Sequence, residues 1–291
     1  MNPMPSLKNS LSAPEKKLGI VAGGGALPKQ IISWCQNHQI PYYALAIQGN
    51  ANPDIFTPDM AYEWIRIGQA GTGFKRFKEE GVKEIILIGT IKRPTLSELI
   101  PDLRTTAFFA RIGTKSLGDD GILRALIKEI EHEGMHVIGI QEIIPELLVK
   151  EGLLTKKKPD KEDEEDIRRG VEVAEILGKL DVGQSVVVQQ GLVLGVEGIE
   201  GTDKLIERCS NYQRKGKSAI LVKMRKPQQD LRIDLPTIGT NTIENAHKYG
   251  LKGLAIHAGN TLIVNEQEVI NLANKYGLFI KGIIPSEYQQ C

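Results

Sequence analysis

The segment from Lys223 to Gly239 carries acidic and basic side chains at a spacing that suits phosphate chemistry. Asp230 and Asp234 lie four positions apart, with Arg232 between them. In an extended backbone alternate side chains point to the same face, so these three would share one surface. Carboxylate oxygens suit a hard cation such as Mg²⁺ or Mn²⁺, which bridges substrate phosphates. We predict Asp230, Asp234 and Arg232 as catalytic; a surface loop with incidental ion pairs is the alternative.

Basic side chains precede these acids in the same segment, at Lys223, Arg225 and Lys226. Cations in such a place would offset the charge that develops on phosphoryl oxygens during transfer. The segment therefore predicts a phosphate-bearing substrate, bound by Lys223, Arg225, Lys226 and Gln229.

A second acidic group stands at Glu200-Gly201-Thr202-Asp203, directly before a helical run. Thr202 or Asp203 could simply cap that helix. A helix start rich in carboxylates, with no glycine-rich phosphate loop, is more typical of a cation or hydroxyl site. We predict Glu200 and Asp203 as metal ligands beside Asp230 and Asp234, and Thr202 as a substrate-binding residue.

The glycine turn Gly23-Gly24-Gly25 follows a short apolar run and leads into a helix. Backbone N–H groups in such a turn can approach a phosphate, and the helix dipole adds to the attraction. The dinucleotide-binding fingerprint fails, because Pro28 occupies its third glycine position. We predict that Gly23, Gly24 and Gly25 bind a phosphate or nucleoside, with a plain tight turn as the alternative.

Paired acids at Asp119 and Asp120 precede a predicted helix over residues 121–133. They could cap the helix, or they could reach a ribose or a cation. Position alone leaves both interpretations open, and we include both residues among the substrate-binding candidates.

Several function classes are disfavoured by the composition and by missing motifs. Lys plus Arg total 37 and Asp plus Glu total 36, so no global field would recruit nucleic acid. The sequence contains no CxxC pair, no phosphate-binding P-loop and no Gly-x-Ser-x-Gly elbow. The five histidines lack metal-ligand spacing, which disfavours a zinc or binuclear site. The sequence has no run of 18 apolar residues, about the length needed to span a bilayer.

The order of the predicted elements positions these residues in two α/β domains. Apolar runs at 18–22, 41–47, 64–67, 84–88 and 136–140 alternate with helices. This pattern predicts a doubly wound, mostly parallel sheet in a Rossmann-like domain over 18–148, after a disordered tail over 1–17.

The second half of the chain begins with a highly charged stretch, which predicts a solvated linker over 149–165. Beyond it, we expect a helix from Ile167, a hairpin over 186–196, strands over 218–222, 254–257 and 262–264, and helices over 244–249 and 266–276. These elements predict a mixed-sheet α/β catalytic domain over 166–291.

These segments together resemble one family. The string Lys226-Pro227-Gln228-Gln229-Asp230-Leu231-Arg232-Ile233-Asp234-Leu235-Pro236-Thr237 is the most specific part. The glycine turn after Leu18, Gly118-Asp119-Asp120, Glu200-Gly201-Thr202-Asp203 and Gly253-Leu254-Ala255-Ile256 also match. The resemblance covers Leu18 to about Ile284. It is to the bacterial UDP-2,3-diacylglucosamine pyrophosphatases of lipid A synthesis, the type unrelated to metallophosphoesterases.

The resemblance implies a Mg²⁺-dependent, cytoplasmic hydrolase. It would cleave the diphosphate of UDP-2,3-diacylglucosamine to UMP and 2,3-diacylglucosamine 1-phosphate, with the essential carboxylate at Asp230 or Asp234. Peripheral contact with the inner membrane and homo-oligomer formation stay open, and no nucleic-acid partner is implied. The chain departs from the expected pattern at His257, where an acid is anticipated. The rival hypotheses are a non-catalytic nucleotide-sugar binding protein and a nicotinamide-dependent oxidoreductase.

The first prediction concerns the two acids of the specific string. We expect Asp230→Ala or Asp234→Ala to fold normally and to hydrolyse the substrate at least about 100-fold more slowly, because removal of one electrostatic group typically costs that much. Circular dichroism and a UMP-release assay measure the two properties. Near-normal turnover would remove the substituted residue from the site.

Overall fold

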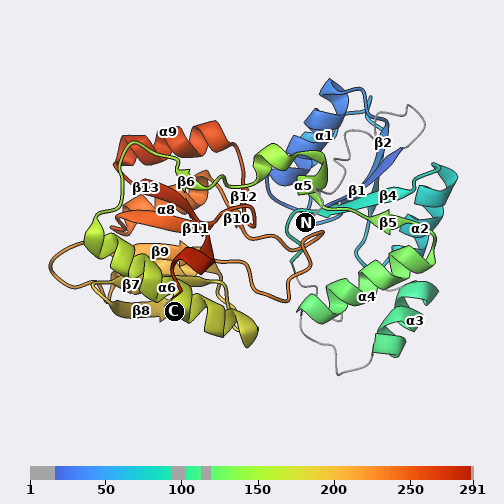
Figure 1. The fold of residues 1–291 in the computed structure, drawn as a ribbon. Coiled ribbons are helices and arrows are strands. Elements are labelled where there is room, and N and C mark those ends of the chain that lie inside the picture. Colours follow the sequence, from blue (N-terminus) through green and yellow to red (C-terminus); the bar gives the residue numbers. More distant parts are fainter. Residues whose placement is uncertain (1–16, 93–101, 113–118, 290–291) are drawn as a thin grey trace. The chain divides into compact units, whose positions relative to one another are not determined.

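The computed structural model describes residues 17–92, 102–112 and 119–289 (Figure 1). The chain divides into two compact units, Met1–Pro145 and Glu146–Cys291, and each is described by itself below. The disordered tail predicted over 1–17 falls almost wholly outside the described residues. Its last residue, Lys17, forms an ion pair with Glu80 at 2.7 Å.

The first unit is built on a five-stranded sheet in the order β3-β2-β1-β4-β5, with every neighbouring pair parallel. Its strands are β1 (Leu18–Ala22), β2 (Tyr42–Ile47), β3 (Tyr62–Ile65), β4 (Glu84–Ile88) and β5 (His136–Val137). Its helices are α1 (Leu27–Asn37), α2 (Ala70–Glu79), α3 (Leu103–Ile112), α4 (Asp119–His132) and α5 (Ile140–Ile143).

The doubly wound arrangement predicted for this unit is confirmed. The three central strands, β2, β1 and β4, are short and mostly apolar, and they are largely buried on both faces, as parallel strands covered by helices require. The chain passes from β1 through β2 to β3 at one edge of the sheet. It then crosses back to β4, on the other side of β1, and ends at β5 on the opposite edge. Because such crossovers are right-handed, helices come to lie on both faces. Pro28 stands in the first turn of α1, where its missing N–H costs nothing.

The second unit contains a six-stranded mixed sheet in the order β6-β13-β11-β9-β7-β8. The three central strands are parallel to one another; β6 pairs in antiparallel fashion with β13, β7 with β9, and β8 with β7. A small parallel pair is formed by β10 and β12. The strands are β6 (Gly152–Leu153), β7 (Ser185–Gln189), β8 (Leu192–Val196), β9 (Ile220–Lys223), β10 (Thr237–Ile238), β11 (Gly253–His257), β12 (Leu262–Ile263) and β13 (Phe279–Ile283).

Helices cover both faces of this sheet, which gives three layers (Figure 1). Residues of α7 (Thr202–Ser210), α8 (Thr240–Lys248) and α9 (Glu266–Tyr276) share one core cluster with inward residues of β7, β9, β11 and β13. The other face packs on α6 (Lys161–Lys179) through Ile167, Val171 and Ala174. Among the described residues, no helix combines the length and apolar character needed to cross a membrane.

The segment predicted as a solvated linker, residues 149–165, is instead folded into the second unit. Val149 is buried in the core, and residues 152–153 form β6 at the edge of the sheet. Asp160 caps α6, and its backbone N–H donates to Asp163 in a reciprocal capping box. The charge density that suggested solvation belongs to a helix start whose acids meet lysines from neighbouring segments.

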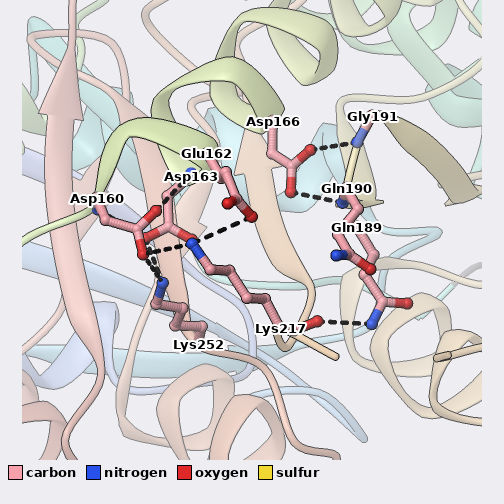
Figure 2. A network of polar contacts seen from close by, with 9 residues as sticks. All are labelled: Asp160, Glu162, Asp163, Asp166, Gln189, Gln190, Gly191, Lys217 and Lys252. Carbon is pink, nitrogen blue, oxygen red and sulfur yellow. Dashed lines mark hydrogen bonds and ion pairs between the residues drawn. The ribbon is translucent and has the colours of Figure 1, made fainter. Parts of the chain in front are cut away.

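Those contacts form the network drawn in Figure 2. Lys252 lies 2.7 Å from carboxylate oxygens of both Asp160 and Asp163, and Asp163 is only 2% exposed. Lys217 reaches Asp160 and Glu162 on the more exposed side. One turn further along α6, Asp166 accepts the backbone N–H groups of residues 190 and 191 in the β7–β8 turn. The network therefore fixes the start of α6 to three segments of the sheet.

The second prediction separates the two lysines of this network. Lys252→Met leaves the buried Asp163 carboxylate without its cation, so we expect a loss of about 1–3 kcal/mol in the free energy of unfolding. Lys217→Met removes only exposed ion pairs and should change stability little. Urea unfolding at pH 7 measures both variants; equal losses would contradict the assignment of Lys252 as the buried partner.

Candidate active site

The carboxyl ends of the parallel strands β9 and β11 lie at one edge of the second sheet, and the loop that follows β9 there carries several of the predicted residues. Lys223 ends β9 and His257 ends β11, and these two strands are neighbours. Strand β7 runs the opposite way, so its first residue, Ser185, lies beside Lys223. In open α/β sheets, ligands bind outside the carboxyl ends of parallel strands. This edge is therefore the candidate site.

Lys223 is the buried centre of this edge, with only 5% of its surface exposed. Its ammonium donates to the hydroxyl of Thr202 at 2.7 Å, and this hydroxyl donates in turn to Glu197 at 3.1 Å. The Ser185 hydroxyl lies 3.2 Å from the same oxygen. Burial lowers the pKa of Lys223, while the carboxylates of Glu197 and Asp203 act in the opposite direction. The predicted pair Lys223 and Thr202 is thus in direct contact.

The loop after β9 is held against the end of α6. The Lys226 ammonium donates to Asp181 at 2.6 Å, and the Gln228 side chain donates to the backbone carbonyl of Gly178 at 2.7 Å. Gln229 is buried, and its side-chain carbonyl accepts the Lys226 backbone N–H. Lys226 is therefore used in fixing the loop, although it was predicted to bind substrate.

The segment around Asp230 and Asp234 does not have the extended backbone that we predicted. The backbone N–H groups of Ile233 and Asp234 both point to the carbonyl of Asp230, which closes a turn. Asp230 accepts three hydrogen bonds from Arg232, two of them from the guanidinium at 3.0 and 2.8 Å. The prediction that all three side chains share one strand face is wrong, because a turn replaces the strand.

Asp234 has different surroundings from Asp230. Its Oδ2 accepts a hydrogen bond from the Gln229 side chain at 2.9 Å. Gln229 also donates to Gln184 at 3.3 Å, and Gln184 directly precedes Ser185 in the chain. Asp234 is therefore linked through Gln229 to the segment that carries Ser185. No described residue donates a hydrogen bond to its Oδ1, which leaves that oxygen available to a ligand.

The two remaining predicted metal ligands, Glu200 and Asp203, lie at the start of α7. Glu200 accepts hydrogen bonds from Arg208 at 2.6 Å and from the backbone N–H of Gly198, and the Arg208 bond lowers its pKa. Asp203 is exposed in the first helical turn. Within residues 17–92, 102–112 and 119–289, no three His, Cys, Asp or Glu side chains gather as a metal site. The four predicted ligands are not brought together.

Two N–H groups of the glycine turn in the first unit already donate to backbone carbonyls. The N–H of Gly23 donates to Ile88, and the N–H of Gly24 donates to Thr90. A Cβ at Gly23 would stand 2.6 Å from the carbonyl oxygen of Thr90, so the close approach of the ends of β1 and β4 requires glycine there. Both N–H groups already have partners, and the predicted phosphate contact then rests on Gly25.

The acidic pair Asp119 and Asp120 lies in the first turn of α4, two residues earlier than the helix start predicted. Acidic residues in a first turn favour a helix through its dipole. Their side chains lie outside the described residues.

His257 stands where the family resemblance anticipated an acid. Its Nδ1 faces the backbone N–H of Arg225 at 3.4 Å, and its Nε2 lies 3.2 Å from the Asn260 side-chain amide. Burial, with the nearby Arg225 charge, lowers the pKa of His257 to about 4. The ring is therefore neutral at pH 7 and adds no charge to the site.

The third prediction tests this neutral state. Because the folded pKa lies below the ordinary value of about 6.5, neutral His257 contributes stability that is present above pH 6.5 and is lost as the pH falls toward 4. An NMR titration of the ring should show its midpoint near 4, and Arg225→Met should raise that midpoint. A midpoint at or above 6 in the unmodified chain would contradict the assigned environment.

One residue of this edge, Glu197, escaped the sequence analysis. It follows an ordinary hairpin strand, and its importance depends on the pairing of β7 with β8 and β9. The one signal in the sequence was an acid three residues before the Glu200 motif, directly after an apolar strand. Its burial (7% exposed) and its contact with Thr202 are visible only in the fold.

The chain matches family models described as the LpxI N-terminal domain over residues 17–147 and the LpxI C-terminal domain over residues 150–281. It is also similar to the UDP-2,3-diacylglucosamine pyrophosphatase LpxI of Caulobacter vibrioides. The two are 37% identical over 279 residues, which cover 94% of this chain and 99% of that protein. The family resemblance drawn from the sequence motifs is thereby confirmed, and the chain belongs to the LpxI family.

Proposed function

We propose that this chain hydrolyses the diphosphate of UDP-2,3-diacylglucosamine to UMP and 2,3-diacylglucosamine 1-phosphate, a step of lipid A biosynthesis. Membership of the LpxI family supports this activity. The observation that carries it on this chain is a pair of cations two residues apart: Lys223 is buried, and Arg225 is half-buried with its Nε atom fully buried. Each has unused donor capacity among the described residues, at the ammonium of Lys223 and at Nε of Arg225.

These two cations suit the diphosphate. An ammonium has three donors, and the Lys223 ammonium makes one hydrogen bond, to Thr202. The buried Arg225 Nε has no partner in the described part of the chain. Phosphoryl oxygens of a bound diphosphate would accept from both groups. Because Lys223 is already held in place by Thr202, it would offset transition-state charge without reorganisation.

A divalent cation, Mg²⁺ or Mn²⁺, fits this edge through few protein ligands. Mg²⁺ usually keeps several waters and binds through one or two carboxylates together with substrate phosphates. Asp234 suits such a role, because one of its oxygens accepts from Gln229 and the other is available. When bound, the cation would withdraw charge from the diphosphate. Asp230 would instead position Arg232 for the substrate, since the guanidinium donates to both of its carboxylate oxygens.

We also propose that the chain works in the cytoplasm, at the inner face of the cytoplasmic membrane, where a diacylated substrate would be found. Leu180 and Ile199 support contact with lipid, because both are large apolar side chains that are exposed, Ile199 fully so. Co-sedimentation with phospholipid vesicles tests this contact. Homo-oligomer formation is the second part of the proposal, and the mass of the chain in solution tests it.

The activity is tested by incubating the purified chain with UDP-2,3-diacylglucosamine, with and without Mg²⁺, and measuring UMP. Hydrolysis predicts UMP release that depends on the cation. Tight UDP binding without UMP release would favour the non-catalytic binding protein. Binding of NADH would favour the oxidoreductase, whose fingerprint is already broken at Pro28.

The fourth prediction distinguishes the two acids of the loop. Asp234→Asn should raise the Mg²⁺ concentration needed for half-maximal activity and lower kcat about 100-fold or more, because it removes a negative ligand. Asp230→Asn should mainly raise KM, since it releases Arg232; the loss of turnover expected from the sequence for either acid is thereby assigned to Asp234. Cation titrations at saturating substrate measure the difference. An unchanged cation requirement in Asp234→Asn would exclude this carboxylate as the ligand.

A further inference from the structure

Glu197 is a buried carboxylate. The nearby charge of Lys223 explains only in part why a carboxylate stands there. Its backbone N–H donates to the carbonyl of Ser185 at 2.8 Å, which fixes it at the carboxyl edge of the sheet. Its Oε1 accepts the Thr202 hydroxyl. Its Oε2 is fully buried and accepts no hydrogen bond from any described residue. Buried polar atoms in folded proteins nearly always have a partner, so this oxygen indicates a ligand.

The same small cluster has unused donors as well. Lys223 and Glu197 both bond to one atom, the Thr202 hydroxyl oxygen, so the ammonium and the carboxylate lie close to the same hydroxyl. Asp203, in the first turn of α7, also acts on the Lys223 charge. The cluster therefore presents donor capacity on Lys223 and an acceptor on Glu197 within one buried region.

This combination selects the chemistry of the ligand. The Lys223 ammonium has two donors left after its bond to Thr202, and a phosphoryl oxygen can take one of them. At the position next to Glu197, however, the carboxylate would repel a phosphoryl oxygen. A hydroxyl group or a water molecule can accept from Lys223 and donate to Glu197 at the same time. In a hydrolytic reaction the water molecule is itself the second substrate.

We propose that Glu197 is the general base of the hydrolysis and that Lys223 and Thr202 position the attacking water against it. This inference rests on the proposed diphosphate hydrolysis. The water oxygen forms a bond to one phosphorus of the diphosphate, and a water proton passes to Oε2 of Glu197. The bond from that phosphorus to the bridging oxygen breaks, and its electron pair stays on the leaving phosphate. The proton on Glu197 then returns to solvent.

A purely structural role for Glu197 is the competing explanation, since its charge could merely balance that of the buried Lys223. The two explanations differ in what they expect of turnover. A counter-charge would affect the stability of the fold and the binding of substrate. A general base would affect kcat and leave KM almost unchanged, because the water and not the sugar nucleotide contacts it.

The test compares Glu197→Gln with Glu207→Gln, a control on α7 whose carboxylate pairs with Lys204 at the surface. We expect Glu197→Gln to lower kcat for UMP release by about 10²–10⁴-fold, the usual contribution of a general base, with KM within about threefold of wild type. The control should keep wild-type kinetics. Thermal unfolding of each variant reports whether the fold is retained.

Chemical rescue supplies the second measurement. In Glu197→Ala, added formate should restore turnover in proportion to its concentration, by about tenfold or more, and should leave the wild type unaffected. Rescue of this kind requires a proton acceptor at the vacated position. If the Gln variant does not fold, Glu197→Asp, which retracts the carboxylate by one methylene, is expected to show the same selective loss of kcat.

The outcomes separate this proposal from the one on which it rests. Wild-type turnover in Glu197→Gln or Glu197→Asp, a loss confined to KM, or the absence of formate rescue would overturn the general-base assignment alone. Absence of UMP release by the wild-type chain would remove the proposed hydrolysis and this inference with it.

Discussion

The candidate site depends on keeping an ammonium group buried at the end of a central strand. Lys223 lies within the hydrogen-bonded ladder of β9, between β7 and β11, and has almost no contact with solvent. A buried charge is costly unless it is hydrogen-bonded and paired. The fold meets this requirement through Thr202 and Glu197, and these residues come from the segment that follows β8. The position of the lysine thus requires the β7–β8 hairpin and the start of α7 to lie where they do.

The two edges of the second sheet differ in whether their buried polar groups have partners. At the amino ends of its parallel strands, α6 begins in a network of carboxylates and lysines that satisfies its own charges (Figure 2). At the carboxyl ends, Lys223, Glu197 and Arg225 keep unsatisfied donors or acceptors among the described residues. The two edges contain similar residue types. The difference lies in whether the polar groups have partners, and unsatisfied buried groups are retained where a ligand can complete them.

Much of the architecture could be predicted from local pattern, because buried parallel strands and amphipathic helices have clear periodicity. The strand over 84–88 and the helix over 266–276 match the structure residue for residue. Strand β13, Phe279–Ile283, was not predicted; it begins only three residues after the end of α9, and Lys281 and Gly282 interrupt its apolar run. The linker prediction over 149–165 was wrong because local charge density cannot reveal that Lys252, some 90 residues later, neutralises Asp163. The pairing is a property of the sheet.

The site could be predicted only in part, because its contacts also depend on how the strands pair. Lys223 and Thr202 could be identified from their motifs, but the motifs do not show that the two touch, because that contact depends on antiparallel pairing of β7 with β8 and β9. The string around Asp230 gave the correct residues with the wrong backbone. Alternating charges suggest a strand, yet the Asp230 carbonyl accepts two successive N–H groups and bends the chain. This turn directs Asp230 onto Arg232 and Asp234 onto Gln229. Two acids four residues apart thereby acquire different hydrogen-bond partners, which their spacing alone could not assign.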